Sequence, residues 1–362
     1  MLHKKLTAAV FVMVLVFGLF AAGCGDDDGT ADTVDTGIKG EIRFTFAPDP
    51  GWDWIVDQGI LEEMETESGI RIIQSLTWDE FGLFAGGHAD IVSMGSFEVP
   101  VLEYETGVET VTYAKYNLSR DIVVVPGDEP WETLDDLPAG CQVAVETFVG
   151  STTIWQAFAA DQYGRDLSEG SDDLQMLLAD FAVIPDLVIQ GEACAGISGA
   201  STAATEIMAG DLKPLYDGKG ASQLFGEFYK PGHAGMTSND FISLLSWYED
   251  HPEEIAFFNE VWQVAVDEWH ANIPEIVEAY PQHFTSEGPE QVAFAIDWYT
   301  NVFNFFVDNV YLDEEWINNE AEVFNILVRA GIIPEDQEPP LYVCIDPATG
   351  EETCRIRSGG DL

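Results

Sequence analysis

The chain has 362 residues, of which 65 are Asp or Glu and only 14 are Lys or Arg, so its formal net charge is −51. This charge excludes a nucleic-acid-binding protein, because phosphate backbones are held by Lys and Arg side chains that displace counterions. The apolar and aromatic fractions, 46% and 12%, exclude a disordered chain because they supply a core. The length allows about two domains, since single cores stop growing beyond roughly 250 residues.

The acidic residues are spread through every segment of the sequence. We interpret them as a solvated surface suited to high external salt, where screening over roughly 3–10 Å removes their mutual repulsion. A cation-binding surface is the alternative, but the sequence contains no loop of the EF-hand type. The pattern therefore favours a salt-adapted surface over a metal site.

The N-terminus combines a basic start at residues 3–5 with an almost unbroken apolar run at residues 6–22, which ends close to Cys24. The run is shorter than the about 20 residues that a membrane-spanning helix needs, so we expect cleavage rather than anchoring by the peptide itself. These features resemble a bacterial lipoprotein signal. The resemblance implies a signal peptide at residues 1–23, then a lipid on Cys24 and an acidic tether at residues 24–37, which hold the protein at the outer face of the cell membrane. The alternative is a secreted protein without the lipid.

Apart from Cys24, four cysteines remain, and in an oxidising compartment they allow three pairings. Cys344 and Cys354 flank a segment with Asp-Pro and Thr-Gly steps, which is typical of the turn of a short hairpin that a disulfide would join. Cys141 and Cys194 each begin a short strand-like run, so they are positioned to meet at the same end of adjacent parallel strands. Metal binding is the rival interpretation, but no Cys-x-x-Cys pair or His cluster accompanies them.

The hydrophobic pattern alternates strand-like and helix-like segments from residue 40 onward. In a first series we expect strands at residues 42–46, 70–75, 90–94, 110–113 and 121–125, and helices at 55–67, 78–84 and 99–106. In a second series we expect strands at 142–145, 193–198 and 214–216, and helices at 152–163, 171–178 and 202–209. Further helices are expected at 237–249, 252–269, 288–308 and 313–330. The alternation predicts an α/β fold with mainly parallel sheets flanked by helices, followed by extra C-terminal helices.

Several separated motifs agree with one protein family. They are Gly86-Gly87-His88-Ala89-Asp90-Ile91, the segment at residues 131–140 that leads into Gln142-Val143-Ala144-Val145, and Gly150-Ser151 at an expected helix start. Their order and spacing resemble the solute-binding proteins of ABC importers, most closely the branch that binds sulfonates, taurine, nitrate and thiamine-precursor pyrimidines. The likeness spans roughly residues 42–284. Cys194 stands where such proteins often carry an acidic residue.

The resemblance implies the type II periplasmic binding protein fold, in which two α/β lobes are joined by paired crossovers and hold a ligand between them. Residues 38–118 and 230–340 are then expected to form lobe one, residues 119–229 lobe two, and residues 341–362 a C-terminal hairpin tail. It also implies a monomer without a cofactor, which hands its ligand to an ABC permease and ATPase. One alternative is a sensor lipoprotein without a permease. Another is an enzyme similar to thiamine-pyrimidine synthase, although that cysteine-rich signature is missing and no catalytic constellation stands out.

The expected site follows from a general property of open α/β sheets, whose ligands lie beyond the carboxyl ends of the strands. Four loops meet that description, at residues 49–53, 95–98, 150–153 and 198–202, and Arg120 lies at the expected first crossover between the lobes. They supply the candidate ligand-binding residues Trp52, Asp53, Ser96, Phe97, Glu98, Arg120, Gly150, Ser151, Thr152, Ser198, Ser201 and Thr202. Backbone N–H groups at the helix starts are suited to hold an anionic head group.

Several side chains of this set have alternative roles. Arg120 either strengthens anion binding or forms a surface ion pair with Asp121 or Glu129. The rings of Trp52 and Phe97 either enclose a ligand or pack in the core. The carboxylates of Asp53 and Glu98 are also able to bind an amino group of a ligand. The resemblance implies a small sulfonate, taurine-like or pyrimidine-like ligand, and the side chains leave an amine open.

Overall fold

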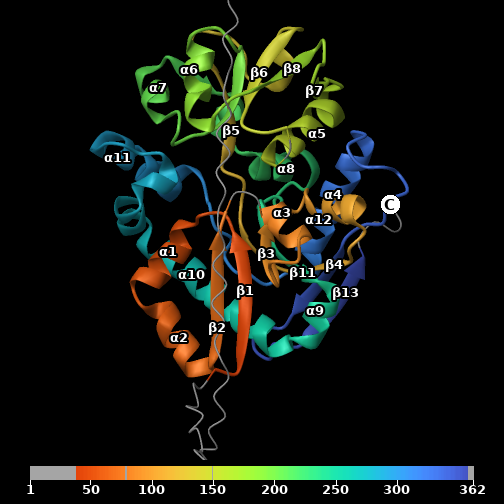
Figure 1. Ribbon diagram of the computed structural model, residues 1–362. Coiled ribbons are helices and arrows are strands. Elements are labelled where there is room, and N and C mark those ends of the chain that lie inside the picture. The colour runs from red at the N-terminus through yellow and green to blue at the C-terminus, as the bar shows by residue number, and fades with distance from the viewer. Residues whose placement is uncertain (1–37, 78–79, 149, 358–362) are drawn as a thin grey trace, which may run out of the picture. The chain divides into compact units, whose positions relative to one another are not determined.

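The computed structural model describes residues 38–77, 80–148 and 150–357. Within these residues the chain forms two mixed β-sheets, each flanked by helices (Figure 1). We call each sheet together with its helices a lobe. The α/β fold expected from the sequence is therefore confirmed.

The first lobe contains a described sheet of seven strands in the order β13-β12-β4-β11-β3-β1-β2. Its strands are β1 (Gly40–Phe46), β2 (Ile70–Leu76), β3 (Ile91–Met94), β4 (Thr110–Asn117), β11 (Asn239–Leu244), β12 (Leu341–Ile345) and β13 (Glu352–Arg357). Its helices are α1 (Pro50–Asp57), α2 (Ile60–Ser68), α3 (Glu80–Ala85), α4 (Val99–Thr106), α9 (Leu245–Asp250), α10 (Pro252–Ala279) and α11 (Pro289–Asp297). The C-terminal hairpin joins this sheet because β12 pairs in parallel with β4.

The second lobe contains a described sheet of six strands in the order β10-β5-β9-β6-β8-β7. Its strands are β5 (Asp121–Pro126), β6 (Cys141–Val145), β7 (Leu167–Ser168), β8 (Leu174–Leu178), β9 (Ala195–Gly199) and β10 (Leu212–Pro214). Its helices are α5 (Ser151–Tyr163), α6 (Ile184–Ile189), α7 (Ala204–Ala209) and α8 (Ala221–Tyr229).

Strand direction changes where the chain crosses between the lobes. Strand β1 pairs in parallel with β2 and β3, and β6 pairs in parallel with β8 and β9. Strands β5 and β11 instead run antiparallel to their neighbours. Each of these two is the first strand after a crossover, so it enters its sheet from the end at which the parallel strands finish.

Two segments connect the lobes, one at residues 118–120 and the other between β10 and β11. The two segments contact each other. The N–H of Ser119 donates to Ser222 Oγ at 2.7 Å, and the N–H of Ser238 donates to the carbonyl of Asn117 at 2.8 Å. The crossovers therefore lie side by side, as the resemblance implied.

Helix α12 (Glu314–Arg329) contacts both lobes. Toward the first, Glu320 Oε1 accepts hydrogen bonds from the N–H and the hydroxyl of Thr237, both at 3.0 Å. Toward the second, its apolar residues join the hydrophobic cluster around α5, and Arg329 Nε donates to Asp161 Oδ1 at 2.7 Å. The resemblance placed this helix with lobe one, and in the structure it forms a third link between the lobes.

Two expected helices are strands in the structure. Residues 171–178 contain β8, in which Leu174 and Met176 are buried and Gln175 is exposed, so the pattern has a period of two. The segment at residues 237–249 contains β11, whose central residues are all buried, and only its end is helical, as α9. A strand that is buried on both faces gives a continuous apolar run, which periodicity alone cannot distinguish from a buried helix.

Two other expected helices have different ends. The helix expected at 252–269 continues to Ala279 as α10. The helix expected at 288–308 is α11 only to Asp297, with one wider turn after it at Trp298–Val302. The aromatic residues that follow, including Phe305 and Phe306, are buried in the core from an irregular segment. The burial of these rings therefore does not depend on a helix.

The core of the first lobe is built from aromatic side chains. Phe44, Trp52 and Trp262 are fully buried, and the rings of the two tryptophans stack with their centroids 5.3 Å apart. Burying side chains of this size contributes roughly 1.5–3 kcal/mol each. The packing holds α1 against α10, so the loop that precedes α1 is fixed at the carboxyl edge of the sheet.

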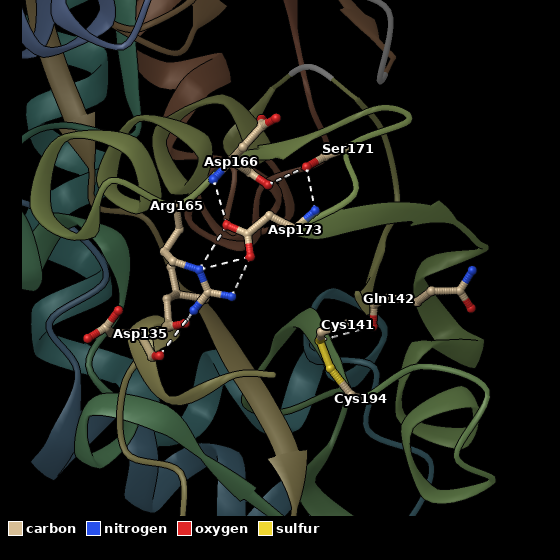
Figure 2. A network of polar contacts seen from close by, with 9 residues as sticks. Asp135, Cys141, Gln142, Arg165, Asp166, Ser171, Asp173 and Cys194 are labelled. Carbon is tan, nitrogen blue, oxygen red and sulfur yellow. Dashed lines mark hydrogen bonds and ion pairs between the residues drawn. A yellow bond between two sulfur atoms is a disulfide. The ribbon is translucent and has the colours of Figure 1, made fainter. Parts of the chain in front are cut away.

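The structure contains the two disulfide bonds that the sequence favoured. Cys141 at the start of β6 pairs with Cys194, just before β9, and their Cα atoms are 5.7 Å apart (Figure 2). Cys344 and Cys354 lie opposite each other in the β12–β13 hairpin, with Cα atoms 4.9 Å apart. Both pairings join segments that β-pairing already brings together.

A charged network reinforces the second lobe near the Cys141–Cys194 bond (Figure 2). Arg165 Nη2 donates to Asp173 Oδ1 at 2.7 Å, and Arg165 Nη1 donates to the carbonyl of Asp135 at 3.0 Å. Arg165 follows α5 and Asp173 precedes β8, so the pair fixes the end of this helix against the sheet.

The predicted N-terminal features lie outside the described residues. These are the signal peptide at residues 1–23, the tether at residues 24–37 and the lipidation site at Cys24. In the part of the chain that the structure describes, no helix combines the length and the apolarity needed to cross a bilayer.

Candidate functional site

The two lobes contact each other through the loop after β3, the segment between α10 and α11, and α11 on the first lobe, and through the N-terminus of α5, the loop after β9, and α7 on the second. Thr202, in the loop after β9, lies with its Oγ1 3.0 Å from Thr285 Oγ1 of the first lobe. Gln291 of α11 donates through Nε2 to Thr205 Oγ1 at 2.8 Å. A Cβ placed on Gly150 would lie 3.9 Å from Glu98 Oε1. We call the set of loops joined by these contacts the interlobe site.

The loop after β1 contributes a buried carboxyl group near the interlobe site. Asp49 is 3% exposed and caps α1, because its Oδ1 accepts the N–H groups of Gly51 at 2.9 Å and Trp52 at 3.1 Å. Burial raises the pKa of Asp49 to about 6, although the two hydrogen bonds and the positive charges of His283 and Arg120 oppose the rise. The structure thus places this carboxyl beside the basic groups of the site.

Asp53 and Arg120 are brought together by a residue that the sequence did not indicate. His283 Nε2 lies 2.7 Å from Asp53 Oδ2, and Arg120 Nη1 donates to the carbonyl of His283 at 3.1 Å. The guanidinium of Arg120 also lies over the ring of Phe305, 5.1 Å from its centroid. Among the described residues no ion pair links Arg120 to Asp121 or Glu129, so the surface pairing considered from the sequence is absent.

Arg120→Gln is expected to lower the free energy of unfolding by about 1–2 kcal/mol at pH 8 and by less at pH 5. At pH 8 the buried Asp49, whose pKa is about 6, is ionised and loses a nearby positive charge, whereas at pH 5 it is mostly protonated. Urea unfolding at the two pH values measures the difference. Arg71→Gln, on the exposed side of β2, is the matched control and should have equal, small effects at both. A pH-independent loss would contradict the interaction with Asp49.

The loop after β3 contributes three candidate residues with different surroundings. Ser96 is buried, and its hydroxyl donates to the carbonyl of Thr237 at 3.3 Å. Glu98 accepts the N–H of Gly95 through Oε2 at 2.9 Å, and burial raises its pKa against this hydrogen bond. Phe97 is 2% exposed and joins the hydrophobic cluster of the second lobe. Two polar groups of this loop therefore lie at the interlobe site, while its aromatic ring packs away from solvent.

The second lobe contributes the N-terminus of α5 and the loop after β9. Gly150 precedes α5 with a φ of +62°, a conformation that favours glycine. Ser151 is partly exposed, whereas Thr152 is buried. Ser198 in β9 and Ser201 in the loop after it are buried, and Thr202 makes the contact with the first lobe.

The candidate residues therefore fall into two groups. Trp52 and Phe97 lie within hydrophobic clusters, which agrees with the core alternative considered for the two rings. The other residues lie in loops, in the first turn of a helix or at the end of a strand, and they are Asp53, Ser96, Glu98, Arg120, Gly150, Ser151, Thr152, Ser198, Ser201 and Thr202.

Beneath the Ser96 loop lies a buried carboxyl pair that sequence patterns did not reveal. Asp240 of β11 and Glu320 of α12 are 0% and 1% exposed. Both oxygens of Asp240 and the Oε2 of Glu320 have no hydrogen-bond partner among the described residues. Burial raises the pKa of Glu320 to about 7, against the hydrogen bonds from Thr237. Burial and the nearby Glu320 also raise the pKa of Asp240 well above its usual range.

No protein-family model and no curated protein sequence matches this chain. Solved structures do match. The periplasmic aliphatic sulphonate binding protein SsuA from Escherichia coli is 14% identical with a TM-score of 0.63, over 89% of this chain and 94% of that one. The alkanesulfonate-binding protein SsuA from Xanthomonas axonopodis pv. citri, bound to MOPS, is 13% identical with a TM-score of 0.61, over 82% and 94%.

The periplasmic nitrate-binding protein NrtA from Synechocystis is also similar, at 12% identity and a TM-score of 0.55, over 82% of this chain and 83% of that one. Likeness at such low identity concerns the fold. This chain has the periplasmic binding protein fold, as expected from the sequence motifs.

Proposed function

We propose that this protein is an extracytoplasmic solute-binding lipoprotein that captures a small molecule between its lobes and delivers it to an ABC importer. The observation that carries the proposal is the contact of the two lobes at the strand ends of the second, where Thr202 Oγ1 in the loop after β9 lies 3.0 Å from Thr285 Oγ1 of the first lobe. Ligands of open α/β sheets bind at such strand ends. The similarity to structures of binding proteins over most of both chains supports the same function.

Capture depends on contacts that form only when both lobes touch the same molecule. On the first lobe we assign these contacts to Asp53, Ser96 and Glu98. On the second we assign them to Ser151 and to the loop after β9. The contacts stabilise the closed arrangement, and a permease then recognises its shape. Trp52 and Phe97 support the site by packing beneath it.

The ligand proposed from the sequence resemblance is a small sulfonate, a taurine-like molecule or a pyrimidine-like molecule. The lipid proposed for Cys24 keeps the protein at the outer face of the membrane, next to the permease that the ATPase subunits drive. Release of an unchanged ligand distinguishes this function from the enzyme alternative, in which the bound molecule is altered. Ligand-dependent uptake through a permease distinguishes it from a sensor.

Thr202→Arg is expected to abolish ligand binding without unfolding the protein. The arginine places a bulky charged group in the 3.0 Å contact with Thr285 and holds the lobes apart. A thermal-shift screen at high salt with sulfonates, amino acids, pyrimidines and amines measures the effect. A true ligand stabilises the protein as RT ln(1 + [L]/Kd). The wild type should respond to at least one compound, and the variant to none.

The control for this experiment is Thr66→Arg, on the exposed face of α2, which introduces the same side chain away from the interlobe site. It should keep the wild-type response. Mass spectrometry of the released compound should show an unchanged molecule. A wild type that responds to no compound, or that releases an altered one, contradicts the proposed function.

A further inference from the structure

Helix α11 is held in the first lobe by one of its faces. Ala295 is fully buried in the aromatic core of that lobe, and Val292 and Ile296 pack against the same core. The helix packs on α10 of the first lobe and also contacts α7 of the second, so it lies where the lobes meet (Figure 1). A helix anchored in this way moves with the first lobe when the lobes separate.

Another face of α11 contacts the second lobe and the chain that leaves it. Gln291 Nε2 donates to Thr205 Oγ1 at 2.8 Å, at the interlobe site. Trp298, two helical turns further along, lies against Gly218 of the second crossover. A Cβ placed on Gly218 would be only 2.7 Å from Cη2 of the Trp298 ring. The contacts therefore begin at the interlobe site and continue along α11 to the crossover.

The ring of Trp298 packs against apolar clusters of both lobes. One is the first-lobe core that contains Trp52 and Trp262, and the other packs α6 on the second-lobe sheet. Among the described residues, Trp298 alone packs against both of these clusters. Its ring also stacks on Phe294 of the preceding turn, with the two centroids 5.6 Å apart. The helix thus holds the ring in place between the lobes.

The polar contacts on this side of the molecule contribute little to holding the lobes together. The hydrogen bonds of Thr202 with Thr285 and of Gln291 with Thr205 are exposed to water. Water replaces either partner when the lobes separate, so the net contribution of such a bond is small. Water gives no such compensation to a large apolar ring that becomes exposed. The contact of Trp298 is therefore the one whose loss opposes opening on this side.

We propose that α11 is an arm that holds the second lobe against the first before any ligand binds, and that Trp298 is the anchor of this arm. The assignment rests on the proposed solute-binding function and goes beyond it, because it concerns the ligand-free protein. Trp298 is a positioning residue, since it acts through the arrangement of the lobes. When only the closed arrangement has the complete site, the apparent Kd is the intrinsic Kd divided by the closed fraction. Loss of the anchor should then weaken the binding of every ligand by the same factor.

Small-angle X-ray scattering of the ligand-free protein tests the anchor directly. Trp298→Ala should have a larger radius of gyration than the wild type, and Trp298→Phe, which keeps an aromatic ring, should stay close to the wild type. Trp247→Ala is the matched control, because Trp247 is also half-buried and packs against the first-lobe core. It should leave the radius unchanged. A Trp298→Ala variant as compact as the wild type would overturn the proposal.

Two glycines test the same contact from the other side. Gly218 and Gly140 both have a φ of +82°, so an alanine has a comparable backbone cost at either position. Only the alanine at 218 meets the Trp298 ring, since no atom of the described residues lies within 4 Å of a Cβ on Gly140. Gly218→Ala should enlarge the radius of gyration, whereas Gly140→Ala should lower only the Tm. Equal radii for the two variants would contradict the role of this contact.

Calorimetric titration with ethanesulfonate, taurine and cytosine separates this proposal from the proposed function. Trp298→Ala should raise the Kd of each compound that binds the wild type by one common factor of about ten, which corresponds to about 1.4 kcal/mol. Unequal factors would show that Trp298 contacts the ligand, and tighter binding would show that it holds the lobes apart. Either result overturns the arm and leaves the proposed function intact. Failure of every compound, here and in the thermal-shift screen, would overturn the proposed function, while scattering still decides the role of Trp298.

Discussion

Glu320→Gln should make the folded protein more stable at pH 8 by about 3 kcal/mol at most, and by about 1 kcal/mol at pH 5. Burial raises the pKa of Glu320 from 4.5 to about 7. A raised carboxyl pKa means that the folded state binds the proton more tightly than the unfolded state. The folded state therefore loses stability as the pH rises from about 4.5 through 7. Glutamine has no proton to lose, so the advantage of the variant grows across this window.

The surroundings of Glu320 suit an amide. Its Oε1 accepts two hydrogen bonds from Thr237, which a glutamine Oε1 can also accept. Its Oε2 has no partner among the described residues, and the neighbouring Asp240 has two carboxyl oxygens in the same condition. A glutamine Nε2 can donate to one of them. Lys115, also buried, adds a positive charge that lowers the pKa of both acids, but its Nζ is hydrogen-bonded elsewhere.

Denaturant unfolding of the wild type and of Glu320→Gln at pH 5 and pH 8 gives the difference in their free energies of unfolding at each pH. Glu275→Gln, at an exposed position of α10, serves as the control and should show no pH-dependent gain. A variant that is less stable than the wild type at pH 8 would show that the ionised carboxylate is itself required. Equal effects at the two pH values would show that Glu320 does not titrate in this range.

Removal of the Cys141–Cys194 disulfide should destabilise the protein by about 4 kcal/mol, and removal of the Cys344–Cys354 disulfide by about 2.5–3 kcal/mol, if chain entropy dominates. The bonds close segments of 53 and 10 residues, and the longer loop costs more entropy to close in the unfolded chain. Replacing each cysteine pair by alanines, one pair at a time, allows a direct comparison of the two losses of stability.

Guanidinium unfolding under non-reducing conditions measures the two losses in the same protein. The comparison is internal, because each variant removes the same chemical bond and leaves the other in place. A larger loss for the hairpin pair, or equal losses, would show that native packing around the bonds outweighs loop entropy. The β12–β13 hairpin lies at the edge of the first-lobe sheet. Removal of its disulfide should therefore leave the hydrogen-exchange rates of the second lobe unchanged.

Much of the fold was predictable because its signals are local. Alternating strand and helix patterns gave the α/β class, and turn residues between Cys344 and Cys354 indicated the hairpin. The exceptions are informative. Strand β11 has a run of buried residues without a period, and the sheet around it, rather than its own pattern, makes it a strand.

The positions of the loops after β1, β3 and β9 could also be predicted, because these loops follow strand ends and precede helices. Their side-chain partners could not. His283 contacts Asp53 across 230 positions of sequence, and Glu320 contacts Thr237 across 83. No spacing rule links residues so far apart. Trp52 shows the complementary problem, since an aromatic ring near a loop has the same sequence pattern whether it lines a pocket or fills a core.

The position of α12 restricts how the two lobes can separate. Because the helix is bound to the first lobe through Glu320 and to the second through Arg329, large translations of one lobe past the other would break the buried hydrogen bonds of Glu320 and the ion pair of Arg329 with Asp161. The two crossovers impose the same restriction. We therefore expect any separation of the lobes to keep α12 and the crossovers together and to proceed by rotation of one lobe against the other.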